Sequence, residues 1–305
     1  MKSLHTWPCW VCSSFCLLVC EIFQDSGESF KDTALLEQAA EPKFERIRVN
    51  IELMLKSNSQ DLSQRHIALT GASNFRDLGG YAGHMGRPVK WRKIFRSDHL
   101  ANLSPDDLLQ VQSLGVKRSF DFRGVQESQA QSYDWPDLKR HSLSIEPTVV
   151  QRLQAQHLTG KPLTAADALD AMQTTYRDFV RVDSRRFAEL FENLLDHADP
   201  LLFHCTAGKD RTGLAAALVL YALDVSESDI WHDYLLTNQL YKRNSTGVTS
   251  LAPDVLKIVW EVQESFLQAS LEQIQISHGN VQNYLSNELG ITPAAKLRLQ
   301  SLYLD

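Results

Sequence analysis

The stretch from His204 to Gly213, HCTAGKDRTG, combines a thiol, a lysine, a carboxylate and an arginine within ten residues. Cys205 is the first reactive side chain, and five residues separate it from Arg211. Apolar residues before His204 predict a buried strand, and an Ala- and Leu-rich segment from Thr212 predicts a buried helix. A tight loop between them directs backbone N–H groups and the positive helix end towards one point. This geometry predicts an anion-binding site.

The side chains of this loop fit phosphoryl transfer. A thiol near a helix N-terminus and a fixed cation ionises easily, so we expect Cys205 to be a thiolate at neutral pH. Arg211 can donate two hydrogen bonds to phosphate oxygens, and Gly208 permits the positive φ that lets the loop curl around an anion. The pattern predicts a cysteinyl-phosphate intermediate stabilised without a metal or cofactor. A Walker loop is excluded, since Asp210 follows Gly208-Lys209 where that motif requires Ser or Thr.

The surrounding elements predict an α/β fold with a central, mainly parallel sheet flanked by helices. We expect strands over residues 91–96, 116–122, 141–145 and 200–203. We expect helices from the Ser104-Pro105 start to Gly115 and over residues 165–182, 184–197, 212–222, 226–241, 254–272, 279–288 and 293–303. We expect the rest of residues 123–165 to be irregular.

The complete loop motif resembles the signature of the bacterial, cysteine-dependent protein tyrosine phosphatases, a family that includes an enzyme with phosphoinositide activity. Three further stretches look like that family's motifs: Asn74–Gly80 (NFRDLGG), Phe95–Asp98 (FRSD) and Asp121–Glu127 (DFRGVQE). The resemblance covers roughly residues 66–304. It implies the tyrosine or dual-specificity phosphatase fold. It also implies a helical lid insertion over residues 165–197, whose apolar stripes could alternatively be core.

The resemblance also implies roles for the loop residues. Cys205 is the expected nucleophile and Arg211 the phosphate clamp, while Thr212 would hydrogen-bond to the sulfur and help it leave. His204 would order the loop, a role compatible with that of a buried, hydrogen-bonded histidine. The remaining expected substrate contacts come from Thr206, Ala207, Gly208 and Lys209. Of these, Lys209 would meet a second phosphate, unless it is an ordinary surface lysine.

The leaving oxygen needs a proton, and a positioned acid contributes about 10²–10⁴ in rate. Asp210 lies in the loop itself, so we expect it to be the general acid, with Asp121 as second choice and a loop brace as the alternative role. Arg76, Asp77, Asp121 and Arg123 are expected on loops at the carboxyl edge of the sheet. There they would either touch substrate or pin the loops together through buried ion pairs.

Several functions remain compatible with these motifs. We expect a phosphatase acting on phosphotyrosine in proteins. The alternative within the enzymes is a phosphatase for phosphoinositides or other phosphorylated small molecules, which Lys209 would favour. A sulfur transferase is disfavoured by the Arg-Thr-Gly ending of the loop. An inactive phosphate-binding module is disfavoured because both Cys205 and Arg211 are present.

The composition of the chain limits the classes of partner that it is expected to bind. The chain has 305 residues, a net charge of −6 and a pI of about 5.9, which disfavours binding to nucleic acid. Four of the five cysteines, Cys9, Cys12, Cys16 and Cys20, lie in the apolar N-terminal segment. Their compact spacing and apolar surroundings disfavour a metal site there. We expect an N-terminal extension over residues 1–60, a catalytic domain over residues 61–305 and a cytoplasmic protein. If residues 1–23 act as a signal, the protein is instead secreted or membrane-attached.

Overall fold

The computed structural model describes residues 62–157, 162–243 and 251–305. The chain divides into two compact units, Met1–Ser59 and Gln60–Asp305, and the described residues belong to the second. The four N-terminal cysteines and the predicted extension therefore lie outside the described residues.

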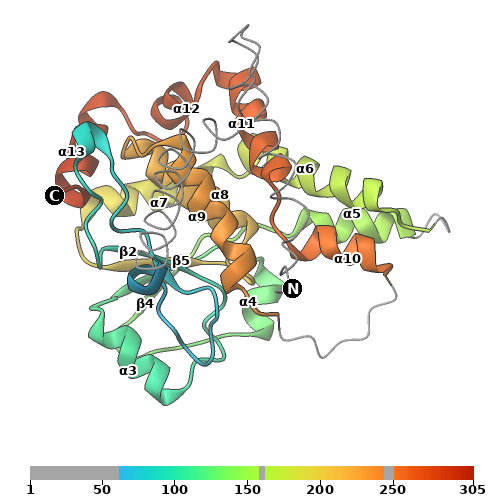
Figure 1. Cartoon of the computed structure of the whole chain (residues 1–305), viewed down its shortest axis with the longest axis horizontal. Coiled ribbons are helices and arrows are strands. Elements are labelled where there is room, and N and C mark those ends of the chain that lie inside the picture. The colour runs from blue at the N-terminus through green and yellow to red at the C-terminus, as the bar shows by residue number, and fades with distance from the viewer. Residues whose placement is uncertain (1–61, 158–161, 244–250) are drawn as a thin grey trace, which may run out of the picture. The chain divides into compact units, whose positions relative to one another are not determined.

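The described residues form a five-stranded sheet in the order β1-β2-β5-β3-β4 (Figure 1). The strands are β1 (Arg76–Asp77), β2 (Ile94–Ser97), β3 (Arg118–Asp121), β4 (Lys139–Ser142) and β5 (Leu201–His204). Strands β2, β5, β3 and β4 are parallel to one another, and β1 pairs with β2 in the antiparallel direction. The mainly parallel sheet predicted from the sequence is confirmed.

Helices cover both faces of this sheet. In chain order they are α3 (Pro105–Ser113), α4 (Val125–Ala130), α5 (Thr148–His157), α6 (Ala165–Arg181), α7 (Ser184–Asp196), α8 (Asp210–Ala222), α9 (Glu227–Leu240), α10 (Pro253–Trp260), α11 (Glu264–His278), α12 (Val281–Asn287) and α13 (Pro293–Tyr303), with a short 3₁₀ turn η1 (His84–Gly86). As predicted, Ser104 caps α3 with Pro105 at its first position. Within the described part of the chain, no helix is both long and apolar enough to span a membrane.

Alternating side chains of the strands divide the core into two layers. Leu201 and Phe203 belong to the large cluster that the helices α6, α7, α8 and α11 complete, whereas Leu202 between them belongs to a smaller cluster. Phe95 of β2 and Val111 of α3 join that smaller cluster. Because side chains alternate across a strand, α3 lies on the opposite face of the sheet from α7 and α8, as Figure 1 shows.

Helices α6 and α7 correspond closely to the predicted helices over residues 165–182 and 184–197. Their apolar stripes, including Tyr176, Phe179 and Phe187, are buried in the large cluster. The stripes are therefore core, as the alternative interpretation held. An action of these helices as a lid remains a prediction.

Two expectations about the helices are wrong. The rest of residues 123–165 is not irregular, since it contains α4 and α5 besides β4, which overlaps the expected strand over residues 141–145. The helix α4 buries none of its residues, and so it has no apolar stripe that would reveal it. The helix expected over residues 254–272 is two helices, α10 and α11. Between them Val262 donates its N–H to the Asn238 side chain and accepts a hydrogen bond from it, which stabilises the break.

Register brings the carboxyl ends of the three central strands together. Ser97 of β2 and Asp121 of β3 both lie opposite His204 of β5. The residues after these strand ends therefore share one edge of the sheet, which is where ligands bind in open α/β sheets. Cys205 follows His204 directly, so the fold places its thiol at that edge.

Candidate active site

The predicted anion loop connects β5 to α8. Cys205 is a buried free thiol, only 2% exposed, at the start of the loop. The helix begins at Asp210, two residues earlier than expected, so Arg211 belongs to its first turn. Gly208 has a φ of 63°, the left-handed conformation that the sequence predicts. A Cβ atom there would lie 2.3 Å from the carbonyl oxygen of Ser97, so only glycine fits.

Three successive carbonyl groups of the loop are held from outside. His99 donates its backbone N–H to the carbonyl of Thr206, and the Asn74 side chain donates to the carbonyls of Ala207 and Gly208 at 3.0 and 3.1 Å. In a planar trans peptide the next N–H points opposite to the carbonyl. The N–H groups of residues 207, 208 and 209 therefore point towards the other side, as an anion cradle requires.

A buried ion-pair network supports this arrangement. Arg96 donates to the carbonyl of Gly208 at 2.8 Å and to Asp233 at 2.6 Å. Arg76 binds the other oxygen of Asp233 at 3.0 Å and also donates to Asn74. Burial would raise the pKa of Asp233, but the two arginines outweigh it and keep that carboxylate ionised. Burial, with Arg96 nearby, lowers the pKa of Arg76 to about 10.

Arg211 is bound by a carboxylate for which the sequence suggested no role. Its Nη1 and Nη2 atoms donate to Glu127, and Nη1 also donates to the carbonyls of Phe122 and Ile145. Thr206 donates its hydroxyl to the same carboxylate. Burial alone would lower the pKa of Arg211, but Cys205 and Glu127 raise it, so the guanidinium stays charged.

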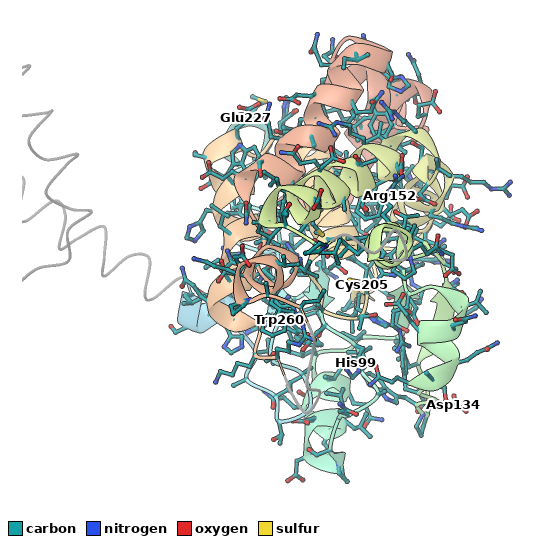
Figure 2. All side chains as sticks on the ribbon, turned by 90° about the vertical axis from the view of Figure 1, so that its right-hand side faces the viewer. His99, Asp134, Arg152, Cys205, Glu227 and Trp260 are labelled. Carbon is teal, nitrogen blue, oxygen red and sulfur yellow. The ribbon has the colours of Figure 1, made fainter. Side chains whose placement is uncertain are left out.

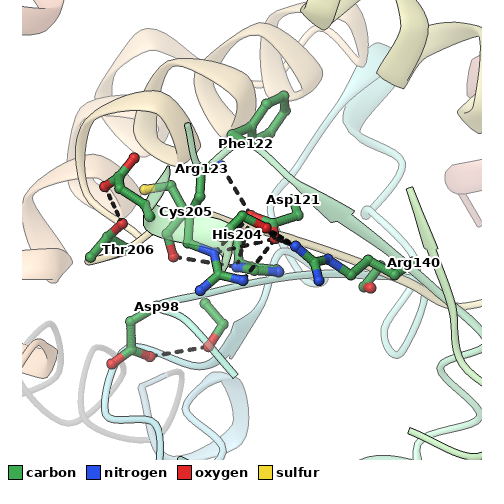
Figure 3. Close-up of polar contacts among 12 residues, drawn as sticks. Asp98, Asp121, Phe122, Arg123, Arg140, His204, Cys205 and Thr206 are labelled. Carbon is green, nitrogen blue, oxygen red and sulfur yellow. Dashed lines mark hydrogen bonds and ion pairs between the residues drawn. The ribbon is translucent and has the colours of Figure 1, made fainter. Parts of the chain in front are cut away.

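Asp121 is the centre of a second network, shown in Figure 3. Arg123 and Arg140 form ion pairs with it at 2.8 and 2.7 Å, and Ser128 donates a hydroxyl hydrogen bond. Burial opposes ionisation, but His204 and Arg123 lower the pKa of Asp121. A carboxylate held ionised by two arginines is a poor proton donor, and this weakens Asp121 as a candidate acid.

His204 lies under the loop and is completely buried. Its Nε2 atom is 2.7 Å from the Tyr133 hydroxyl, and its Nδ1 atom is 3.3 Å from the carbonyl oxygen of Cys205. Burial lowers the pKa of His204 to about 4, so the ring is neutral. Both contacts are satisfied if Nδ1 donates to the carbonyl and Nε2 accepts from the tyrosine.

Arg76 and Asp77 do not lie on loops at the carboxyl edge, contrary to expectation. Both belong to β1, which runs antiparallel to its neighbour, with Asp77 opposite Phe95. Asp77 accepts hydrogen bonds from the backbone N–H groups of Gly79 and Arg92. Burial raises the pKa of Asp77. These partners of Asp77 flank β1 and β2 and do not belong to the loop that connects β5 to α8.

Lys209 and Asp210 bind each other. The Lys209 ammonium donates to Oδ1 of Asp210 at 3.0 Å and to the carbonyl of Glu261, at the break between α10 and α11, at 3.1 Å. Lys209 is only 4% exposed, so the surface-lysine interpretation is wrong. The side chain of Asp210 is 25% exposed. Thr212 is buried, and its hydroxyl has no hydrogen-bond partner among the described residues.

A pocket of about 930 Å³ opens above the loop. Its floor contains Cys205, Lys209, Asp210 and Arg211, and its wall includes Trp260 of α10. Figure 2 labels Cys205 near Trp260 and His99, and all three residues line the pocket. The arrangement can hold a phosphate ester over a sulfur atom, with a cation and a carboxylate beside it.

Comparison with known proteins identifies one family to which this part of the chain is similar. The model of the tyrosine phosphatase family matches residues 67–305. A Cupriavidus necator protein named "putative tyrosine-protein phosphatase" is 36% identical over 248 residues, covering 75% of this chain and 86% of that protein. Triple specificity protein phosphatase PtpB of Mycobacterium tuberculosis is 28% identical over 275 residues, covering 77% and 98%. The solved Siw14 catalytic core aligns with 15% identity and a TM-score of 0.33, covering 72% of this chain and 98% of that one.

Proposed function

This chain belongs to the tyrosine phosphatase family and is a phosphoric monoester hydrolase, and we propose that it acts through a cysteinyl-phosphate intermediate with Cys205 as the nucleophile. The sulfur attacks phosphorus, an S–P bond forms and the P–O bond to the leaving group breaks. Water then attacks phosphorus, the S–P bond breaks and phosphate leaves. We further propose that residues 61–305 are the catalytic domain, which the extent of the family match supports.

One observation carries the mechanism. The buried thiol of Cys205 begins a loop whose carbonyls are bound from outside, so its N–H groups can stabilise the charge of a phosphoryl group. Arg211 supplies the cation beside it, and its planar fork can bind two phosphate oxygens. In this mechanism Thr206, Ala207 and Gly208 contact the phosphate through their backbone. The buried hydroxyl of Thr212 is available to the sulfur, because no described residue binds it.

Asp210 is the proposed general acid. It would give its proton to the leaving oxygen in the first step and take one from the attacking water in the second. Its place on the pocket floor and its partial exposure support this role. Asp121 supports it less well, since two arginines hold that buried carboxylate ionised.

Phosphotyrosine in proteins is the substrate class of the family. A phosphoinositide or another multiply phosphorylated molecule is a second candidate, which one observation on Lys209 favours. An ammonium has three donors, two of which go to Asp210 and to the Glu261 carbonyl. The third is available to a second phosphate in the pocket. With a phosphoinositide substrate, the protein would have to contact a membrane.

The mechanism is tested with p-nitrophenyl phosphate in a metal-chelating buffer. Cys205→Ser should abolish turnover while the protein remains folded and still binds vanadate. Arg211→Lys should lose about 10²–10³-fold in kcat/KM, because a point charge cannot replace the planar fork. Arg185→Lys, on an exposed arginine of α7, is the matched control. Clear hydrolysis by folded Cys205→Ser would refute the cysteine mechanism.

A further inference from the structure

A buried tyrosine from a distant helix touches the proposed acid. Tyr176 of α6 is completely buried, and its hydroxyl donates to Oδ1 of Asp210 at 2.9 Å. The same hydroxyl lies 2.7 Å from that of Tyr234 on α9, which is 1% exposed. The two rings meet edge to face, with centroids 6.5 Å apart. The three side chains therefore form a line from the helical layer to the pocket.

The direction of the hydrogen bonds in this line follows from counting protons. Burial raises the pKa of Tyr176 and of Tyr234 well above the usual value, so each keeps its single hydroxyl proton. Tyr176 uses its proton on the Asp210 carboxylate, which can only accept when ionised. The Tyr234 hydroxyl also lies 3.5 Å from the Gln263 carbonyl, but its 2.7 Å contact with Tyr176 requires a proton between the two oxygens, so Tyr234 donates to Tyr176. The line of donors runs from Tyr234 through Tyr176 to Asp210.

This line makes the two oxygens of Asp210 different. Oδ1 accepts from Tyr176 and from the Lys209 ammonium. Oδ2 accepts no hydrogen bond from any residue that the structure describes. An oxygen that already accepts two donors, one of them charged, binds a proton poorly. The proton of the acid form therefore belongs on Oδ2 of a side chain that lines the pocket.

We propose that Tyr176 is a positioning residue for the reaction: its hydroxyl anchors Oδ1 of Asp210 and leaves Oδ2 to carry the proton for the leaving group. The proposal rests on the proposed role of Asp210 as the general acid. Tyr176 touches no substrate and acts only through Asp210. Lys209 cannot replace it, because a flexible ammonium fixes the position of an oxygen less well than a tyrosine locked in the core.

The competing role of Tyr176 is structural. Its ring packs against Phe179 and Phe266, with centroid distances of 5.3 and 5.7 Å. A purely structural hydroxyl would affect stability, or lower the rate equally for every substrate. Tyr176→Phe keeps the ring in the core and removes only the hydroxyl, so this variant separates the two roles.

The experiment measures kcat and KM for aryl phosphates of graded leaving-group pKa. Tyr176→Phe should lose about 10-fold in kcat with the poorest leaving groups and little with the best, a part of the 10²–10⁴ that a positioned acid supplies. KM should stay near the wild-type value, because Tyr176 does not line the pocket. Tyr284→Phe is the matched control, since this tyrosine is equally buried but pairs with Ser184.

A double-mutant cycle completes the test. Asp210→Asn alone should show the steepest dependence on the leaving group, and adding Tyr176→Phe should change it no further. A uniform loss with Tyr176→Phe, a raised KM in place of a lowered kcat, or fully additive losses would overturn the positioning role. If Asp210→Asn itself loses rate uniformly while Asp121→Asn steepens the dependence, the acid assignment fails first, and the role of Tyr176 falls with it.

Discussion

Glu127 binds both terminal nitrogens of Arg211, with distances of 2.6 Å to Nη1 and 3.0 Å to Nη2. Glu127 is the third residue of α4, and its other oxygen contacts reach Gly124 and Thr206. One carboxylate thus joins the start of α4, the phosphate loop and the first turn of α8. Burial opposes its ionisation, but the hydrogen bonds from Arg211 lower the pKa of Glu127.

Glu127→Gln should reduce kcat/KM by about 10²-fold, because an amide offers only one acceptor to the guanidinium fork and lets Arg211 move. Steady-state kinetics with an aryl phosphate measures the effect, and a thermal melt checks the fold. Glu272→Gln, on an exposed glutamate of α11, is the control. Wild-type kinetics for a folded Glu127→Gln protein would show that Arg211 needs no carboxylate partner.

Lys209→Ala should weaken hydrolysis of phosphoinositides more than hydrolysis of a phosphotyrosine peptide. The reason is that only a substrate with a second phosphate uses the third donor of the ammonium. Both kcat/KM values should be measured for the variant and for Lys257→Ala, which changes an exposed lysine of α10. Equal losses of kcat/KM on the two substrates would show that Lys209 does not select substrates with a second phosphate and serves only as a partner of Asp210.

Asp233→Asn should lower the free energy of unfolding by about 3–5 kcal/mol, since it leaves Arg76 and Arg96 buried without their counter-charge. Denaturation in urea measures the change. Asp229→Asn, at a half-buried position on the same helix, should cost much less. A loss below about 1 kcal/mol for Asp233→Asn would mean that the asparagine or water satisfies both arginines.

His204 should make the protein less stable in acid. Its pKa is about 4 in the folded state and about 6.5 when unfolded, so the unfolded state binds more protons between these values. Stability is therefore lost as the pH falls from 6.5 to 4, at about 1.4 kcal/mol per pH unit from this residue. Urea denaturation at several pH values across this range measures the free energy of unfolding. This free energy should fall more steeply with decreasing pH for the wild type than for His204→Asn. Parallel slopes would contradict a buried neutral histidine.

The sequence alone determined the parts of this protein that depend on neighbouring residues. The spacing from Cys205 to Arg211, the positive φ of Gly208 and the Ser104 cap are local features, so the printed residues were sufficient to predict them. The apolar stripes of α6 and α7 likewise repeat with helical spacing. Four of the five strands were predicted for the same reason, apart from shifts at their ends, whereas β1 (Arg76–Asp77) was expected to be a loop.

Tertiary structure decided which distant residues meet. Glu127 and Arg211 are 84 positions apart, and Tyr176 and Asp210 are 34 apart. Glu127 stood in a recognised motif without a role, while Tyr176 looked like any apolar core residue of α6. The break between α10 and α11 was also invisible, because Asn238 on α9 stabilises it. Such contacts depend on how the helices pack on the sheet, and no periodicity or local propensity encodes that packing.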